Sequence, residues 1–146
     1  MIIFDLDGTL TDCEHRRHHV SGPKKDWPAF HAACIQDRPR QPIIEIARAL
    51  IQQRRGEVEV WSGRDEAYRE LTEQWYRRWA PHLLDVRTRM RPTGDHRPDE
   101  QLKGNWLALQ LAAGWHIELV FDDRDRMVAF WRSKGILCAQ VAPGDF

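Results

Sequence analysis

Two aspartates near the start of the chain are placed where they could act on phosphorus. Asp5 and Asp7 close a short apolar run and are followed by Gly8 and Thr9. Residues two apart on a strand face the same way, and Gly8 permits a turn that would bring Asp7 over a substrate. The Asp5 carboxylate could attack phosphorus and form an acyl phosphate. Asp7 could protonate the leaving oxygen and then deprotonate the attacking water.

Further polar side chains follow later apolar runs: Ser62 and Arg64 end the second predicted strand, and Asp122 and Asp123 end the fourth. Lys103 opens the predicted helix before that fourth strand. Ligands of open α/β sheets bind at the carboxyl ends of the strands, so we expect these side chains to meet Asp5 and Asp7 at one rim. Ser62 and Lys103 would hold a transferring phosphoryl group, as a hydrogen-bond donor and a point charge.

The charges of this group predict a metal ion. Four carboxylates together carry about −4 and a phosphate monoester adds roughly −2, and like charges so close would force protonation unless cations compensate. A hard divalent cation with oxygen ligands, most simply Mg²⁺, supplies that compensation. Lys103 and Arg64 supply the remaining positive charge.

Strands and helices alternate along the chain, which favours a parallel sheet covered by helices on both faces. Apolar runs predict strands at 2–6, 58–61, 83–86, 117–121 and 136–141. Helical spacing predicts helices at 43–53, 65–79, 98–113 and 125–134, with a loop at 87–98. Glu59 does not fit, because a central parallel strand is expected to be apolar on both sides.

Residues 13–42 break the alternation. Proline and glycine interrupt this segment, and the pattern leaves room for one short helix at 27–34. We interpret the segment as an insertion after the first strand, within a single domain of residues 1–146. As a minimal cap it would leave the site open to large substrates.

Composition limits the classes of protein that the chain could belong to. Lys plus Arg equals Asp plus Glu at 22 each, so no global field would draw the chain to nucleic acid or to an anionic membrane. The three cysteines show no C-x-x-C spacing, which argues against a disulfide framework and favours a reducing cytoplasm. The first residues do not form a signal peptide, and no apolar stretch is long enough to span a bilayer.

The ordered motifs resemble those of the haloacid dehalogenase (HAD) superfamily. That family combines D-x-D-G-T, a strand-end Ser or Thr, a Lys and paired acids, here matched in order by Asp5 to Thr9, Ser62, Lys103 and Asp122-Asp123. The resemblance implies an HAD-like Rossmannoid three-layer α/β fold whose five-stranded parallel sheet has the order 5-4-1-2-3. It also implies phosphoryl transfer, with Mg²⁺ bound by Asp5, the backbone carbonyl of Asp7 and Asp122, supported by Asp123.

A closer likeness is to the phosphatase domains of bacteriophage polynucleotide kinase–phosphatases. It rests on the motifs S-G-R at 62–64, D-D-R at 122–124, F-W-R at 130–132 and Q-V-A-P-G-D-F at 140–146. The resemblance implies removal of 3′-phosphates from nucleic-acid ends and nucleotides, and a phosphate contact for Arg64. No kinase half accompanies these motifs, because the chain has no G-x-x-x-x-G-K-[ST] loop.

Each candidate residue also has a plainer interpretation. Asp5, Asp7 and Asp122 could be capping or turn acids. Ser62 could be the N-cap of a helix after the second strand, and Lys103 a solvated helix lysine.

For Arg64, phosphate contact and a surface ion pair are both open. Arg124 and Arg126 are interpreted as ion-pair residues at a helix start.

The run His15 to His19 allows three interpretations: a solvated surface, contact with substrate phosphate or backbone together with Lys24 and Lys25, or a metal site. Of the seven tryptophans, the insertion's Trp27 could cover a base. Another four lie on predicted helix faces and are assigned to the core: Trp75, Trp79, Trp106 and Trp131.

Three functions are carried forward. The first is a Mg²⁺-dependent phosphatase of 3′-phosphates on polynucleotides or nucleotides. The second is a phosphatase of nucleoside monophosphates or another small phosphoester. The third is a non-catalytic module that binds a partner, although intact Asp5 and Asp7 argue against it. The expected partner is a phosphorylated nucleic-acid end or nucleotide; no protein partner is predicted.

Overall fold

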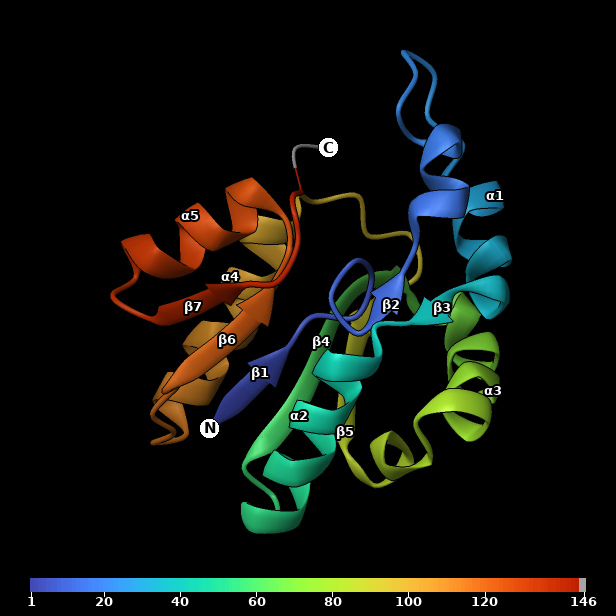
Figure 1. The fold of residues 1–146 in the computed structure, drawn as a ribbon. Coiled ribbons are helices and arrows are strands. Elements are labelled where there is room, and N and C mark those ends of the chain that lie inside the picture. Colours follow the sequence, from blue (N-terminus) through green and yellow to red (C-terminus); the bar gives the residue numbers. More distant parts are fainter. Residues whose placement is uncertain (145–146) are drawn as a thin grey trace.

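A computed structural model describes residues 1–144, and its core is one parallel sheet in the order β5–β4–β1–β6–β7 (Figure 1). The strands are β1 (Ile2–Phe4), β4 (Val58–Asp65), β5 (Arg87–Arg91), β6 (Leu119–Asp122) and β7 (Leu137–Gln140). The predicted fold class is confirmed. The strand labels differ from the predicted numbering because two short strands, β2 (Thr11–Asp12) and β3 (Arg38–Pro39), form a separate antiparallel pair. The predicted order 5-4-1-2-3 thus corresponds to β7–β6–β1–β4–β5.

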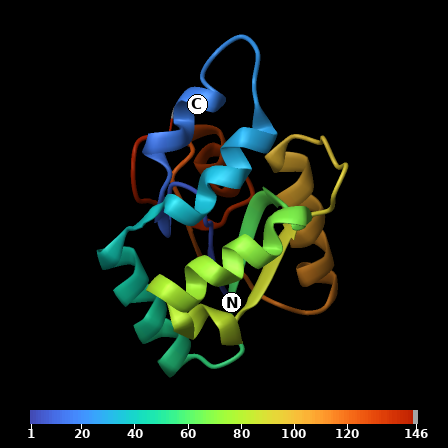
Figure 2. The ribbon, with the colours of Figure 1, turned by 90° about the vertical axis from the view of Figure 1, so that its right-hand side faces the viewer.

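Helices connect the strands. They are α1 (Trp27–Ala32), α2 (Gln41–Gln53), α3 (Arg69–Trp79), α4 (Asp99–Ala112) and α5 (Asp125–Ser133). The described residues also form short 3₁₀ helices: η1 (Glu14–His19), η2 (Ala33–Gln36), η3 (Glu66–Tyr68) and η4 (Pro81–Asp85). Figures 1 and 2 show η1 and α1, in blue, beyond the end of the sheet at which β1 and β4 finish. The insertion therefore lies beside the carboxyl ends of the strands.

The predicted strand at 83–86 is wrong. Those residues lie largely in η4, which begins with Pro81, and the strand β5 follows at Arg87–Arg91 inside the predicted loop. Its sequence is Arg-Thr-Arg-Met-Arg, which carries too little apolar character to be recognised as a strand. β5 is an edge strand that pairs on one side only, with β4. Charged side chains are common on edge strands, because such strands border solvent.

Two apolar cores lie on opposite faces of the sheet because successive side chains of a strand alternate. Ile2 and Phe4 of β1 point to the core covered by α2, α3 and η4, and the Phe4 and Phe121 rings stack with centroids 4.5 Å apart. Ile3 points to the core beneath α4 and α5, where Trp131 is fully buried. The alternation of strand and helix thus produces three layers.

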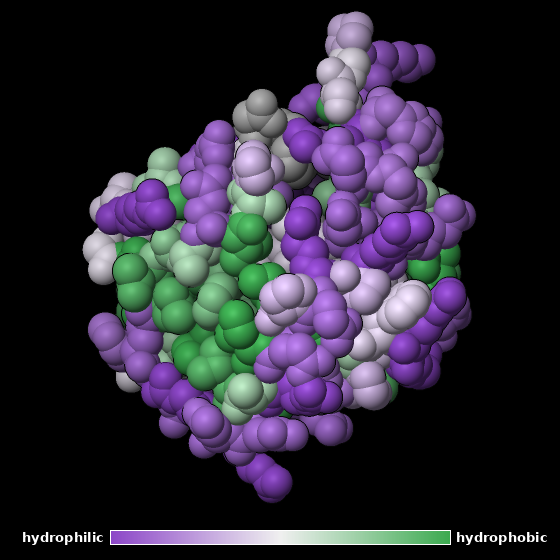
Figure 3. Space-filling view, in the orientation of Figure 1, coloured by the Kyte–Doolittle hydropathy of each residue, from purple (hydrophilic) through white to green (hydrophobic). Residues whose placement is uncertain are grey.

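Coverage of the sheet is uneven. Figure 3 shows apolar side chains in green on the side of the molecule where β6 and β7 lie in Figure 1. Leu137 of β7 is 68% exposed there, and Leu119 and Ala139 are half-buried. The prediction of a sheet covered on both faces therefore holds for β1 and β4 and not fully for this edge.

The four tryptophans assigned to the core differ in how far they are buried. Trp75 and Trp131 are buried, whereas Trp106 is half-buried. The prediction for Trp79 is wrong, because this residue is the last of α3 and remains 38% exposed. Its ring packs instead beneath the Arg78 guanidinium, 4.8 Å from the ring centroid.

Glu59 is explained by three donors that converge on its buried carboxylate. Trp61 Nε1 lies 2.8 Å and Arg89 Nε 2.8 Å from Oε2, and Gln110 Nε2 donates to Oε1 over 2.9 Å. A buried carboxylate is tolerated when its charge is paired and its oxygens are hydrogen-bonded. The network joins β4 to the edge strand β5 and to α4.

No helix formed by residues 1–144 combines the length and the apolar character needed to cross a membrane.

Glu59→Ala is expected to destabilise the protein by about 3 kcal/mol, because it leaves Arg89 and Gln110 without their acceptor in the interior. Urea unfolding followed by circular dichroism measures the change. Glu45→Ala is the matched control, since Glu45 forms an exposed ion pair with Arg48 on α2 and should cost less than about 1 kcal/mol. Equal losses for the two variants would contradict the role assigned to the Glu59 network.

Candidate active site

Three of the predicted acids meet at the carboxyl ends of the two central strands. Phe4 of β1 pairs in register with Phe121 of β6, which places the following residues, Asp5 and Asp122, side by side. Asp123 comes next, and one carboxylate oxygen from each of the three acids lies within 4.8 Å of the others. All three side chains are buried. The strand register thus brings together residues more than 110 positions apart in the sequence.

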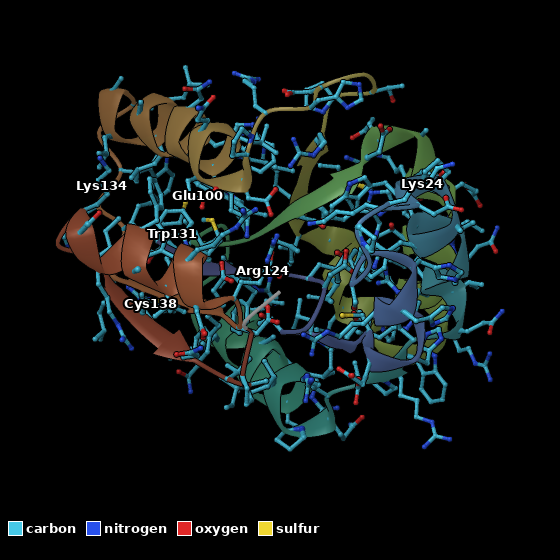
Figure 4. The ribbon with its side chains drawn as sticks, turned by 90° about the horizontal axis from the view of Figure 1, so that it is seen from above. Lys24, Glu100, Arg124, Trp131, Lys134 and Cys138 are labelled. Atoms are coloured by element: carbon cyan, nitrogen blue, oxygen red, sulfur yellow. The ribbon has the colours of Figure 1, made fainter. Side chains whose placement is uncertain are left out.

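Lys103 reaches this acidic cluster from α4. Its Nζ atom lies 2.6 Å from Asp5 Oδ1 and 3.2 Å from Asp122 Oδ2. Trp131 of α5 donates from Nε1 to the same Asp122 oxygen over 3.1 Å. Figure 4 shows Trp131 between α5 and the brown helix α4. The interpretation of Lys103 as a solvated helix lysine is wrong, because its side chain is only 3% exposed.

The cluster carries more negative charge than Lys103 can balance. Burial raises the pKa of Asp5 well above its ordinary value, and repulsion from Asp122 and Asp123 adds to the rise against the Lys103 ammonium. Burial and the neighbouring Asp122 also raise the pKa of Asp123 to about 7. Burial alone would lower the pKa of Lys103, but the carboxylates of Asp122 and Asp5 outweigh this effect and hold the pKa above its ordinary range. Three buried oxygen donors with excess charge fit a divalent cation.

Gly8 allows the chain to turn away directly below this cluster. Its φ of +88° lies in the region that side chains disfavour, and a Cβ atom there would lie 2.1 Å from Asp123 Oδ2. The next residue, Thr9, donates from Oγ1 to Asp123 Oδ1 over 3.4 Å. The glycine of the D-x-D-G-T motif is therefore required both by the turn and by the closeness of Asp123.

Asp7 stands apart from the three acids and is held by two arginines. Arg16 Nη2 lies 2.5 Å from Asp7 Oδ1, and Arg64 bonds the same oxygen through Nη2 and Oδ2 through Nε over 3.3 Å. Burial alone would raise the pKa of Asp7, but the Arg64 and Arg16 guanidiniums outweigh it and hold the pKa far below its usual range. Asp7 is therefore a carboxylate in this state of the protein.

Arg64 and Ser62 lie in the last part of β4. Arg64 is 1% exposed and also donates from Nη1 to Thr72 Oγ1 over 2.9 Å, so the surface ion-pair interpretation is wrong. The Ser62 hydroxyl is buried and accepts a hydrogen bond from the Arg64 backbone N–H over 3.1 Å. No helix begins at Ser62, so its interpretation as a helix N-cap is also wrong.

Arg16 was missed as a site residue. It belongs to the basic run at 15–19, yet its side chain is fully buried and binds both Asp7 and Asp37. His15 Nε2 lies 2.8 Å from the same Asp37, so part of the run faces inward rather than forming a solvated surface. Arg17 instead bonds Glu14 on the outer side of η1. Only the geometry of this 3₁₀ turn separates the two arginines.

A cavity of about 500 Å³ opens onto Asp5 and Asp7. Its lining combines side chains of α1 and η3 with arginines that were not predicted as site residues. Arg91 and Arg124 both bond the carboxylate of Asp99, and Arg124 lies near the centre of the end-on view in Figure 4. The lining comprises Asp5, Asp7, Trp27, Pro28, Phe30, His31, Gly63, Arg64, Asp65, Tyr68, Arg91, Asp95, His96, Arg97, Pro98, Asp99, Arg124 and Arg126.

Comparison with known proteins identifies a family. The family model described as the polynucleotide kinase PNKP phosphatase domain matches residues 1–146. The predicted motif at 140–146 is included in this match, although Asp145 and Phe146 lie outside the residues that the structure describes.

Solved structures show the same fold. A chain of the Pnkp1/Rnl/Hen1 RNA repair complex is 31% identical, with a TM-score of 0.76, over 99% of this chain and 43% of that one. A putative phosphatase from Clostridium difficile is 14% identical, with a TM-score of 0.64, over 95% of this chain and 83% of that one. A haloacid dehalogenase-like hydrolase from Streptococcus pneumoniae is 14% identical, with a TM-score of 0.60, over 95% and 82%. The chain spans less than half the length of the repair-complex protein that it matches.

Proposed function

The chain belongs to the family of polynucleotide kinase PNKP phosphatase domains and is an HAD-type phosphatase, and from this premise we propose its substrate, metal and mechanism. We propose a Mg²⁺-dependent phosphomonoesterase that removes 3′-phosphates from polynucleotide ends or nucleotides through a phospho-aspartate. The observation that carries the proposal is the meeting of Asp5, Asp122, Asp123 and Lys103, with Asp5 also lining the cavity.

Asp5 is the proposed nucleophile. Its carboxylate oxygen forms a bond to phosphorus while the bond from phosphorus to the leaving alcohol oxygen breaks, which gives an acyl phosphate on Asp5. Lys103 Nζ, 2.6 Å from Asp5 Oδ1, supports the charge that passes to the phosphoryl oxygens.

Asp7 is the proposed acid and base. Its carboxylate is held by Arg16 and Arg64, and phosphate oxygens entering the cavity compete for the same guanidiniums. Loss of these contacts raises the pKa of Asp7 toward the range in which it carries a proton for the leaving oxygen. Asp7 then takes a proton from the water that attacks phosphorus and releases Asp5.

Mg²⁺ is the proposed cofactor, with Asp5, Asp122 and the backbone carbonyl of Asp7 as ligands and Asp123 in support. When bound, the ion neutralises charge on the carboxylates and on the transferring phosphoryl oxygens. Ser62 and Lys103 are the proposed phosphate contacts, together with Arg64 and its neighbour Arg16.

The polynucleotide substrate is supported by the family and by the shape of the site. The family takes its name from a polynucleotide kinase, and the protein with 31% identity is part of an RNA repair complex. We propose that residues 13–42 act as a small cap, because they place Trp27 and His31 on the cavity, whereas its arginines come from the rest of the chain. The proposed nucleic-acid end enters between these aromatic and basic side chains.

A substrate panel tests this assignment. Phosphate release should be at least about tenfold faster, as kcat/KM, from a 3′-phosphorylated oligonucleotide than from a 5′-phosphorylated one or a nucleoside monophosphate. Equal or faster release from mononucleotides would favour a phosphatase of small phosphoesters. No release from any substrate with Mg²⁺, together with a stable protein partner in pull-down, would favour a binding module.

Asp5→Asn should lower kcat by at least about 10³-fold, because an amide cannot form the acyl phosphate. Thermal unfolding should show that the variant stays folded, since the neutral amide avoids burying a charge. Asp12→Asn, which changes a partly exposed acid of β2 that does not line the cavity, is the matched control and should leave turnover unchanged. Appreciable turnover by folded Asp5→Asn protein would count against covalent catalysis.

Chelation tests the metal. EDTA should stop phosphate release and added Mg²⁺ should restore it. Without a divalent cation, the ionised carboxylates of the cluster would repel the phosphate of the substrate. Asp122→Asn should raise the Mg²⁺ concentration needed for half-maximal rate by roughly tenfold. Full activity in EDTA would contradict the metal assignment.

A further inference from the structure

An aromatic wall lines the same cavity as Asp5 and Asp7. Trp27 and His31 of α1 line it together with Tyr68 of η3. The Trp27 and His31 rings stack with centroids 5.9 Å apart and planes 26° from parallel. The His31 and Tyr68 rings lie 5.2 Å apart. Three flat side chains from two separate segments thus form one continuous surface.

This wall is not part of an apolar core. Trp27 is 42% exposed, although Phe30 on the same helix is buried in the small cluster with Cys13 and Val20. An indole that lines a cavity and keeps so much of its surface in water contributes little to folding.

His31 points to the same conclusion. Its ring is 8% exposed, and within residues 1–144 its Nδ1 atom has no hydrogen-bond partner. Burial lowers the pKa of His31 to about 4, so the ring is neutral at pH 7 and serves as a flat packing surface. A side chain selected only for packing would avoid a buried polar atom without a partner.

The wall is fixed relative to the reacting groups through Arg16. The Arg16 guanidinium lies over the Phe30 ring, 4.0 Å from its centroid, and donates from Nη1 to the Phe30 carbonyl over 3.0 Å. The same side chain binds Asp7 through Nη2. Tyr68 Oη donates to the Pro28 carbonyl over 3.4 Å, which joins η3 to α1. The distance from the aromatic wall to Asp7 is therefore set by direct contacts.

We propose that Trp27, backed by His31 and Tyr68, stacks on the nucleobase of the nucleotide that carries the phosphate. The inference rests on the proposed function and adds a residue-level basis for preferring nucleotides. A cavity of about 500 Å³ is in the range that holds a small-molecule ligand, with charged groups for the phosphate at one wall and a planar apolar surface at the other. Stacking on an aromatic side chain accepts any base, so it selects a nucleotide without selecting a sequence.

The test compares two 3′-phosphorylated oligonucleotides that differ only at the terminal nucleotide, which carries a base in one and is abasic in the other. Trp27→Ala should lower kcat/KM roughly tenfold for the oligonucleotide with the base, mainly through KM, and less than about twofold for the abasic one. Trp27→Phe should retain most of the preference. Trp115→Ala, which removes a tryptophan of similar exposure that does not line the cavity, should change neither value.

Two results would overturn the inference. Equal losses on both oligonucleotides would mean that Trp27 only supports the fold of the insertion, and no loss on either would mean that the base does not contact it. If the wild-type protein releases phosphate from neither oligonucleotide, the proposed function fails. Stacking is then judged by inhibition of p-nitrophenyl phosphate hydrolysis. A nucleoside monophosphate should inhibit more strongly than ribose phosphate, and Trp27→Ala should remove the difference; equal inhibition of the wild-type protein would reject stacking too.

Discussion

Repulsion among three buried carboxylates governs the architecture of the site. Asp5, Asp122 and Asp123 lie together because β1 and β6 are neighbouring parallel strands, and Lys103 alone cannot balance them. Such a cluster is costly without further positive charge, and folded proteins keep it where a cation or an anionic reaction uses it. The turn at Gly8 leaves room for the Asp123 carboxylate, and Trp131 of α5 donates a hydrogen bond to Asp122.

A second constraint connects the insertion to the sheet. Arg16 enters from η1, and Arg64 comes from β4, and both bind Asp7. Arg16 also fixes α1 through the Phe30 carbonyl and ring. An anion that draws these guanidiniums away from Asp7 would therefore act on the proton-transferring group and on the aromatic wall together. This coupling gives the small insertion a part in the proposed chemistry as well as in substrate recognition.

Sequence patterns predicted the fold class. They also predicted that the four acids, Ser62, Arg64 and Lys103 lie at one rim, because each strand end and each motif can be recognised from neighbouring residues. They failed where local signals were absent. The edge strand at 87–91 is arginine-rich and lacks apolar alternation. The burial of Arg16 depends on the rotation of one 3₁₀ turn toward Asp37, which comes 21 residues later. Glu59 fits its strand only through three partners distant in sequence, so no window of neighbouring residues explains it.

Crystals soaked in Mn²⁺, a stand-in for Mg²⁺ with measurable anomalous scattering, show whether the buried acids bind a divalent cation. An anomalous peak is expected between the carboxylates of Asp5 and Asp122, with oxygen distances of roughly 2.0–2.3 Å, and it should be lost in Asp122→Asn crystals. A peak elsewhere, or none at a saturating concentration of the ion, would contradict the view that these buried acids are assembled to share a divalent cation.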